Sequence, residues 1–283
     1  MRRTRSAWVF RLVIATAGAI LTQMFVYVLQ MVFTFVDSER NLFQLCSTWF
    51  RKIGLHEAVY VLDGLAIFTI AAFVALFARQ SFLVAATRKS LLRMTDAGRT
   101  EEIGRRFRIP SRAGLMVVRS DSPIAFTFGL ARPTIVLSTG IIDLLEEEEL
   151  ASVIHHERFH QISYDPLRCF LLSVLTFVLW FLPILRWQSK YYRIAREVLA
   201  DRYAITAMGS ERSLGSALLK LIRCGTPPVR AAAVSFADTS VNYRMIQLLN
   251  PRDDVMPVLP RGPLLLSVPV ALVIICIYGI GLF

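Results

Sequence analysis

The sequence predicts an α-helical membrane protein with an embedded α+β domain, in which a small antiparallel sheet accompanies a helix carrying the motif H-E-x-x-H. Three observations support this fold class. Hydrophobic residues make up 55% of the 283 residues, and they are concentrated in long blocks instead of alternating with polar residues. The excess of lysine and arginine, a formal net charge of +11, lies largely beside those blocks. Short β-branched and aromatic runs, separated by turn residues, occupy the middle of the chain.

Three apolar blocks are long enough to cross a bilayer, which requires roughly 20 helical residues. The first, Leu12–Val36, contains no charged residue and is too long for the apolar part of a signal peptide. The second, Ala58–Ala78, contains Asp63, a carboxylate that can reach the membrane surface or face a neighbouring helix. The third is Gly262–Phe283. We therefore expect a two-span membrane region over residues 1–78, a central domain over residues 79–260 and a C-terminal transmembrane helix over residues 261–283.

The distribution of basic residues predicts the topology. Arginines precede the first block, and the stretch Arg79–Arg112 contains many more basic than acidic residues. The positive-inside rule places the N-terminus and the region Arg79–Arg261 in the cytoplasm. Nucleic-acid binding is the alternative explanation of such charge. The segment Arg99–Arg112 has Phe107 as its single aromatic residue and adjoins the membrane, where anionic lipids are available, so we expect the lipid bilayer and no nucleic acid as a partner.

The central domain combines a sheet with helices. Three short runs, Leu115–Arg119, Ile124–Phe128 and Thr134–Leu137, have strand composition and are separated by turn-forming residues, which predicts a small antiparallel sheet. A helix is expected to begin near Ile141. The acidic run Glu146–Glu149 then falls in its first turns, where negative side chains favour the positive end of the helix dipole.

The strongest chemical signal is the sequence His156-Glu157-Arg158-Phe159-His160, which matches H-E-x-x-H. Histidines four residues apart lie on the same face of a helix, so both imidazoles can bind one zinc ion. The intervening Glu157 is close enough to act as a general base on water at the metal. Ordinary interior histidines are the alternative explanation of the motif.

A catalytic zinc site needs a third protein ligand. Downstream, Glu197 is followed four residues later by Asp201. We expect Glu197 to complete the ligand set for one zinc ion per chain. Asp201, one helical turn further on, would then accept the outer N–H of a ligand histidine. Without the H-E-x-x-H helix, these two acidic residues would indicate only a solvated helix face.

The apolar run Cys169–Leu185 lies between the two halves of this site and resembles a short membrane span. A complete crossing would put Glu197 and His156 on opposite sides of the bilayer. Two antiparallel helices of about 15 residues travel roughly 23 Å out and back, at 1.5 Å per residue, and would return Glu197 to the same side. We therefore predict a helical hairpin over residues 166–197, whose tip around Trp180–Pro183 dips into the membrane.

These residues together resemble the BlaR/MecR-type membrane zinc metallopeptidases, a gluzincin family of β-lactam sensor–transducers. More distantly, the chain is similar to prenyl-protein (CAAX) and heat-shock membrane proteases. The resemblance covers roughly residues 80–250. It rests on the H-E-x-x-H motif and on segments before and after it: Ser122–Leu137, Asp165-Pro166, Trp180-Phe181-x-Pro183 and Glu197-x-x-x-Asp201.

The resemblance implies a gluzincin (zincin-like) domain that faces the cytoplasm from a bacterial inner membrane. It also suggests that a substrate could add as a strand beside Ile124, Ala125, Phe126 and Thr127, although this run could equally be core packing. The β-lactam sensors carry a penicillin-binding domain after their last span, whereas this sequence stops at Phe283. We therefore expect no direct binding of β-lactams.

The expected activity is zinc-dependent hydrolysis of peptide bonds in a protein substrate, such as a transcriptional repressor, with Glu157 as the general base. An oxyanion donor is also required, for which Arg244, Tyr203 and Tyr243 are candidates. The alternative is a non-catalytic, zinc-bound signalling or scaffold protein, although such a protein has no need of Glu157. A transporter is disfavoured because the predicted spans contain few polar residues.

Overall fold

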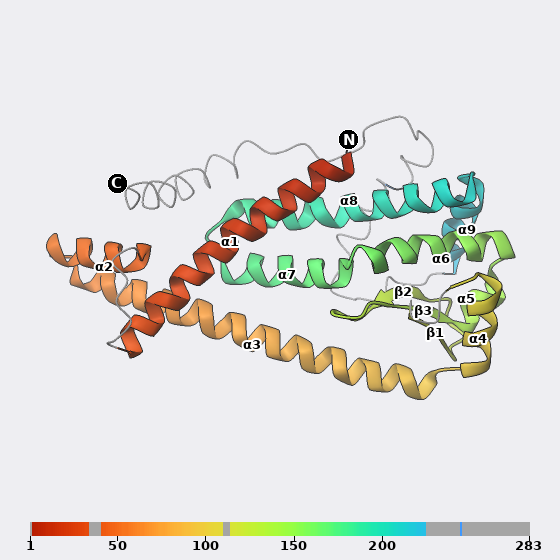
Figure 1. The fold of residues 1–283 in the computed structure, drawn as a ribbon, viewed down its shortest axis with the longest axis horizontal. Coiled ribbons are helices and arrows are strands. Elements are labelled where there is room, and N and C mark those ends of the chain that lie inside the picture. The colour runs from red at the N-terminus through yellow and green to blue at the C-terminus, as the bar shows by residue number, and fades with distance from the viewer. Residues whose placement is uncertain (1, 34–40, 110–113, 225–243, 245–283) are drawn as a thin grey trace. The chain divides into compact units, whose positions relative to one another are not determined.

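A computed structural model describes residues 2–33, 41–109, 114–224 and 244, and shows a mostly helical protein with one small sheet (Figure 1). The chain divides into two compact units. Of the described residues, the first comprises residues 2–33, 41–80 and 172–189, and the second comprises residues 81–109, 114–171, 190–224 and 244.

The first unit contains the described apolar helices, α1 (Arg2–Val32) and the first part of α3 (His56–Met94), together with the short helix α2 (Leu42–Lys52). Two helical segments, Ile14–Val32 and His56–Met94, are long and apolar enough to cross a membrane. They coincide with the first two predicted spans. The third predicted span lies outside the described residues.

Helix α3 is longer than the predicted span Ala58–Ala78, because it continues to Met94 through several basic residues. Neither glycine nor proline occurs between Leu65 and Met94, so no residue in this stretch breaks the helix. Inside the first unit, Asp63 of α3 accepts a hydrogen bond from the hydroxyl of Tyr27 in α1. Asp63 therefore faces a neighbouring helix, which is one of the two arrangements expected from the sequence.

The second unit contains a three-stranded sheet with the order β1-β3-β2, formed by β1 (Leu115–Val118), β2 (Ala125–Phe128) and β3 (Thr134–Ser138). Strands β2 and β3 are antiparallel, as predicted, and are joined by residues 129–133, of which Gly129 has a φ of +103°. The prediction of a wholly antiparallel sheet is wrong, because β1 and β3 run parallel and the sheet is mixed.

The burial of β3 explains its central position in the sheet. Its residues Ile135, Val136 and Leu137 are all fully buried, so this strand is apolar on both faces. A strand of this kind is most stable between two neighbours. Strands β1 and β2 therefore pair with opposite edges of β3 instead of forming a hairpin with each other.

Two helices follow β3, where the sequence predicts a single helix from Ile141. Helix α5 (Thr139–Leu144) is followed by Leu145, whose backbone is extended. Helix α6 (Glu147–Ile162) begins two residues after Leu145. Glu146 and Glu149 form a capping box, in which the Glu149 side chain accepts a hydrogen bond from the Glu146 N–H at 2.9 Å. The acidic run thus begins a new helix.

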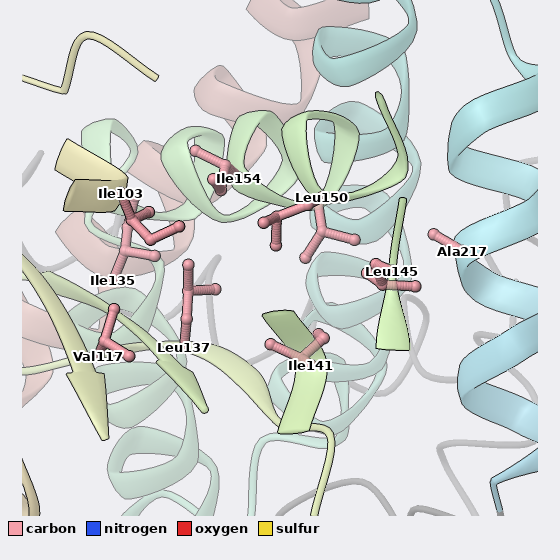
Figure 2. Packing of buried hydrophobic residues seen from close by; sticks show 10 residues of the cluster. Ile103, Val117, Ile135, Leu137, Ile141, Leu145, Leu150, Ile154 and Ala217 are labelled. Carbon is pink, nitrogen blue, oxygen red and sulfur yellow. The ribbon is translucent and has the colours of Figure 1, made fainter. Parts of the chain in front are cut away.

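The apolar core of the second unit lies between the sheet and helices α4 (Ala97–Arg106), α6 and α9 (Arg212–Arg223). Figure 2 shows Leu150 and Ile154 of α6 beside the sheet residues Ile135 and Leu137, with Ala217 of α9 nearby. Burial of each large aliphatic side chain contributes about 1.5–3 kcal/mol. This packing holds α6 against the sheet along one face.

Helices α7 (Asp165–Val178) and α8 (Pro183–Met208) follow α6 and are separated by four residues. Inside the second unit, residues after Lys190 of α8 lie beside the start of α7. The Tyr192 hydroxyl donates to Asp165 at 2.6 Å, and the Arg196 guanidinium lies 3.2 Å from the sulfur of Cys169. The chain therefore folds back on itself, as the two halves of the site require. Membrane insertion of the turn stays a prediction.

Candidate metal centre

Two helices bring three metal-binding side chains together in the second unit. His156 and His160, one turn apart on α6, have their Nε2 atoms 3.1 Å from each other. Glu197 of α8 places its Oε2 3.4 Å from His156 Nε2 and 3.8 Å from His160 Nε2. The two histidines are buried and Glu197 is largely so, and together they form a cluster that can hold a metal ion.

The distances between the donor atoms fit zinc. Tetrahedral zinc with N and O ligands at 2.0–2.1 Å places any two donor atoms about 3.3 Å apart. The three measured separations, 3.1, 3.4 and 3.8 Å, are close to that value. Two histidines and one glutamate also form a donor set used by catalytic zinc sites, which leave one coordination position for water or substrate. The cluster is therefore consistent with the zinc site expected from the sequence.

Each histidine contacts a buried carboxylate through its other ring nitrogen. His156 Nδ1 lies 2.8 Å from Oδ1 of Asp201, and His160 Nδ1 lies 2.7 Å from Oδ2 of Asp165. The two aspartates are 0% and 1% exposed, respectively. Carboxylates in these positions orient both Nε2 atoms toward Glu197 and favour the tautomer that leaves Nε2 free to bind metal. Asp201 thus lies beside His156, and its role as an acceptor for the outer N–H of a metal ligand stays a prediction.

The contact of Asp165 with His160 was not predicted from the sequence, in which Asp165-Pro166 counted toward the family resemblance. The residue follows His160 by five positions, a spacing that does not share a helix face. The chain turns at Tyr164, which has a φ of +53°, and this turn brings Asp165 back to His160. Tyr192 of α8 then donates a hydrogen bond to the other oxygen of Asp165. The signal that the sequence offered for this contact was a polar residue, Asp165, shortly after the end of the H-E-x-x-H helix.

The charge of Glu197 is stabilised by its surroundings. Burial alone would raise the pKa of this carboxyl group. The positive charges of Arg196 and His160 outweigh burial and hold the pKa of Glu197 well below its usual range. The Arg196 guanidinium lies 3.0 Å from Oε1, so Oε2 is the oxygen that faces the histidines. Glu197 is therefore an anionic oxygen donor throughout the neutral pH range.

The metal-free centre favours a protonated His156. Burial and the charge of Arg244 lower the pKa of this imidazole, but contacts with Asp201 and Glu197 outweigh them and raise the pKa to about 9. Burial would likewise raise the pKa of Asp201, yet Arg244 and His156 hold it below its ordinary value. At neutral pH the His156 imidazole therefore carries a proton that it would have to lose to bind a divalent cation.

Arg244, the candidate oxyanion donor, lies at this site. Its guanidinium donates to both oxygens of Asp201, and its Nη1 is 3.9 Å from Oε2 of Glu197. Tyr203, a second candidate, packs its ring against Phe159 and does not line the cavity at the metal centre. Tyr243 lies outside the described residues. Among the described residues, Arg244 is thus the candidate that the structure brings to the centre.

The candidate general base contacts the sheet. Glu157, which lies between the two histidines in the sequence, is buried. The Thr127 hydroxyl of β2 lies 2.8 Å from its Oε2. A cavity of about 430 Å³ adjoins this contact and the metal-binding cluster. Its walls include the four residues of the predicted substrate strand, namely Ile124, Ala125, Phe126 and Thr127.

An H-E-x-x-H helix with a His-His-Glu donor cluster beside a small sheet defines a zinc metallopeptidase. A family model described as BlaR1 peptidase M56 matches residues 8–248, which is most of the chain, so the protein belongs to the M56 peptidase family. The resemblance noted in the sequence is thereby confirmed.

A curated relative supports the same family. The chain is 28% identical over 142 residues to the regulatory protein BlaR1 of Bacillus licheniformis. The aligned region covers 47% of this chain and 24% of the relative. The chain therefore spans about a quarter of the length of that protein.

Proposed function

We propose that this protein is an integral-membrane zinc metalloendopeptidase that hydrolyses peptide bonds of a protein substrate. The observation that carries the proposal is the position of Glu157. In the sequence, Glu157 lies between two histidines whose Nε2 atoms are 3.1 Å apart in the structure. Thr127 contacts the Glu157 carboxylate. A zinc site that served only to hold the fold would need no carboxylate there. The two apolar helices and the M56 family support a membrane location.

Each residue of the centre has a role in the proposed reaction. His156, His160 and Glu197 would hold one zinc ion. When bound, zinc supplies Lewis acidity that polarises a peptide carbonyl and lowers the pKa of water toward about 7. Glu157 accepts a proton from the attacking water and delivers it to the departing amine nitrogen. Arg244 can donate from Nη1 to the oxygen that becomes negative.

The free edge of β2 is suited to a peptide in an extended conformation. Ser138 N–H donates to the Ile124 carbonyl, so the residues that bond to β3 alternate from Ile124 onward. The backbone N–H and C=O groups of Ala125 and Thr127 consequently point away from β3, at the outer edge of the described sheet. A substrate strand could pair with these groups inside the cavity at the metal centre.

We further infer that the catalytic domain faces the cytoplasm from a bacterial inner membrane. The basic stretch Arg79–Arg112 supports this topology through the positive-inside rule. A cytoplasmic centre would reach soluble regulatory proteins, of which a transcriptional repressor is one kind. The relative is named a regulatory protein, which supports a regulatory role for this chain as well.

Replacement of Glu157 by Gln tests the proposal. Glutamine preserves the shape of the side chain and removes the base, so zinc binding should persist while hydrolysis falls by at least about 10²-fold. Cells that produce the wild type or Glu157→Gln are compared by mass spectrometry of protein N-termini. The matched control is Glu101→Gln on α4, whose glutamate is 71% exposed and far along the chain from the motif.

The proposal expects fragments that depend on the wild type and the control variant but disappear with Glu157→Gln. If the fragments and any regulatory phenotype persist unchanged in Glu157→Gln, the endopeptidase function is wrong. That result would favour the alternative of a zinc-bound signalling or scaffold protein without turnover.

A further inference from the structure

Thr127 connects strand β2 to helix α6 through a single residue of the metal-binding motif. Its hydroxyl lies 2.9 Å from the backbone carbonyl oxygen of Glu157 and 2.8 Å from Oε2 of the same residue. Both distances are those of good hydrogen bonds. The hydroxyl has one proton, so the two oxygens share it or receive it in turn.

We propose that Thr127 is a positioning residue of the peptidase, whose hydroxyl holds the Glu157 carboxylate in the orientation needed for proton transfer. The inference rests on the proposed function, because it concerns the general base of that reaction. It assigns a role to the side chain of Thr127 that is separate from the pairing of its backbone with a substrate.

The two contacts do different things. The contact with the helical carbonyl fixes Thr127 relative to the backbone of α6. The contact with Oε2 then fixes the end of the flexible Glu157 side chain relative to that backbone. A glutamate without such a partner distributes over several rotamers, and ordering it costs free energy that must be supplied at each turnover. Among the described residues, Thr127 is the one whose side chain hydrogen-bonds to the Glu157 carboxylate.

The strand itself is suited to this role. Thr127 lies opposite Ile135, a fully buried residue of the central strand β3, so its backbone position is set by the sheet. Threonine is β-branched and has restricted χ1 freedom in a strand. The hydroxyl is therefore placed by the fold before any substrate arrives.

The backbone of Thr127 points toward the outer edge of the sheet that the structure describes, while its hydroxyl contacts Glu157. A peptide that pairs with β2 would therefore order the same residue that orients the base. Substrate binding and the orientation of Glu157 are coupled through one position. Correct pairing of a substrate strand thus favours the catalytic geometry.

The test uses the full-length, zinc-loaded chain in detergent micelles and a peptide or protein that it cleaves. Thr127→Val replaces the hydroxyl with a methyl group and retains the branched shape. Thr127→Ser retains the hydroxyl. Thr134→Val is the matched control, because Thr134 is a strand residue of β3 whose hydroxyl makes only a long 3.4 Å contact with the Arg132 carbonyl among the described residues.

For Thr127→Val, kcat should fall by roughly 10- to 100-fold, the size of effect expected when a catalytic group is displaced by about 1 Å. KM should change by less than about threefold, since the substrate-facing backbone is retained. Thr127→Ser and Thr134→Val should keep kcat within about threefold of the wild type. Zinc content, measured by elemental analysis, should stay at one ion per chain in all variants.

Binding of a peptide hydroxamate gives a readout that does not require turnover. A hydroxamate binds zinc and donates a hydrogen bond to a well-oriented carboxylate beside it. Thr127→Val should weaken its binding by about tenfold, the value of one oriented hydrogen bond to a charged group. Thr134→Val should leave this affinity unchanged.

Three results would overturn the inference. The first is a Thr127→Val enzyme with wild-type kcat, and the second is a Thr127→Val enzyme in which only KM changes. The third is a folded and zinc-loaded Thr127→Ser enzyme that is as slow as Thr127→Val. If Thr127→Val lowers the yield of folded protein, the Thr127→Ser variant still tests the inference. If the wild type binds the hydroxamate but cleaves nothing, the proposed function fails, while hydroxamate affinities of the variants still decide the role of Thr127.

Discussion

Arg244 donates two hydrogen bonds to Asp201, from Nε at 2.8 Å and from Nη2 at 2.9 Å. Asp201 is fully buried and its other contact is with Nδ1 of His156, a residue of the candidate metal site. The guanidinium therefore neutralises a buried carboxylate that contacts this candidate ligand. Arginine suits this position because its planar donors match both carboxylate oxygens.

Replacement of Arg244 by Lys should weaken the centre although the positive charge is retained. Lysine cannot donate two parallel hydrogen bonds, so buried Asp201 loses one of the two hydrogen bonds that Arg244 donates. We expect the free energy of unfolding to fall by about 1–3 kcal/mol and the zinc affinity to decrease. Thermal melting and competition with a chelator measure the two effects. Arg105→Lys, a change at a 77% exposed arginine, is the control, and an equal effect of both variants would refute the prediction.

Asp165 should contribute to zinc affinity through His160. Asparagine at this position keeps the shape but removes the negative charge that His160 Nδ1 contacts at 2.7 Å. The loss of such outer partners typically weakens metal binding by roughly 10- to 100-fold. Chelator competition should show this for Asp165→Asn but not for Asp143→Asn, whose carboxylate is 63% exposed. Unchanged zinc affinity in Asp165→Asn would mean that His160 needs no such partner.

Zinc binding should release protons and strengthen with pH. The pKa of His156 in the metal-free protein is raised to about 9, so its imidazole is protonated at neutral pH and must lose a proton to bind zinc. Affinity should therefore increase by up to about tenfold per pH unit as the pH rises toward 9. Isothermal titration calorimetry in buffers of different ionisation enthalpy measures the released proton. No proton release at pH 7 would show that His156 is already neutral.

The contact between helices α6 and α9 should depend on pH. Lys220 lies 2.7 Å from Oε2 of buried Glu149, whose Oε1 accepts a hydrogen bond from Ser216. Burial would raise the pKa of Glu149, but these partners lower it below 4.5. The stabilisation is therefore present above about pH 4.5 and is lost as pH falls through the lowered value.

Lys220→Met removes the cation and should lower the melting temperature by roughly 2–4 °C at pH 7. The difference from the wild type should shrink as the pH falls below 4.5, because protonation of Glu149 removes the charge that Lys220 contacts. Differential scanning fluorimetry at a series of pH values measures this difference in melting temperature. A difference that stays constant from pH 7 to pH 4 would exclude the ion pair as its cause.

Much of the metal centre could be predicted because its signals are local. His156 and His160 share a helix face through a spacing of four residues, which helix geometry alone establishes. The return of Glu197 could be inferred because a crossing of the bilayer would separate it from His156. The strand positions were also predicted closely, since each run has strand composition and lies between turn residues.

Other features depend on contacts between distant segments. The parallel pairing of β1 with β3 depends on how the chain connects the strands, which the composition of runs of four or five residues does not reveal. The contact of Asp165 with His160 requires a positive φ at Tyr164, a residue type that rarely adopts it. The break between α5 and α6 depends on a capping box within a run of glutamates, any of which could have begun the helix.

By itself, the sequence determined the apolar helices, the His-Glu-x-x-His helix and the chemistry that this motif can perform, because periodicity and residue type act over a few neighbouring positions. The tertiary structure alone decided which oxygens and nitrogens meet. It placed Glu197 3.4 Å from His156, Arg244 on Asp201, and the hydroxyl of Thr127 on the carboxylate of Glu157. Such contacts join residues 30 to 43 positions apart, and their distances are set by packing of helices against the sheet and not by any local preference.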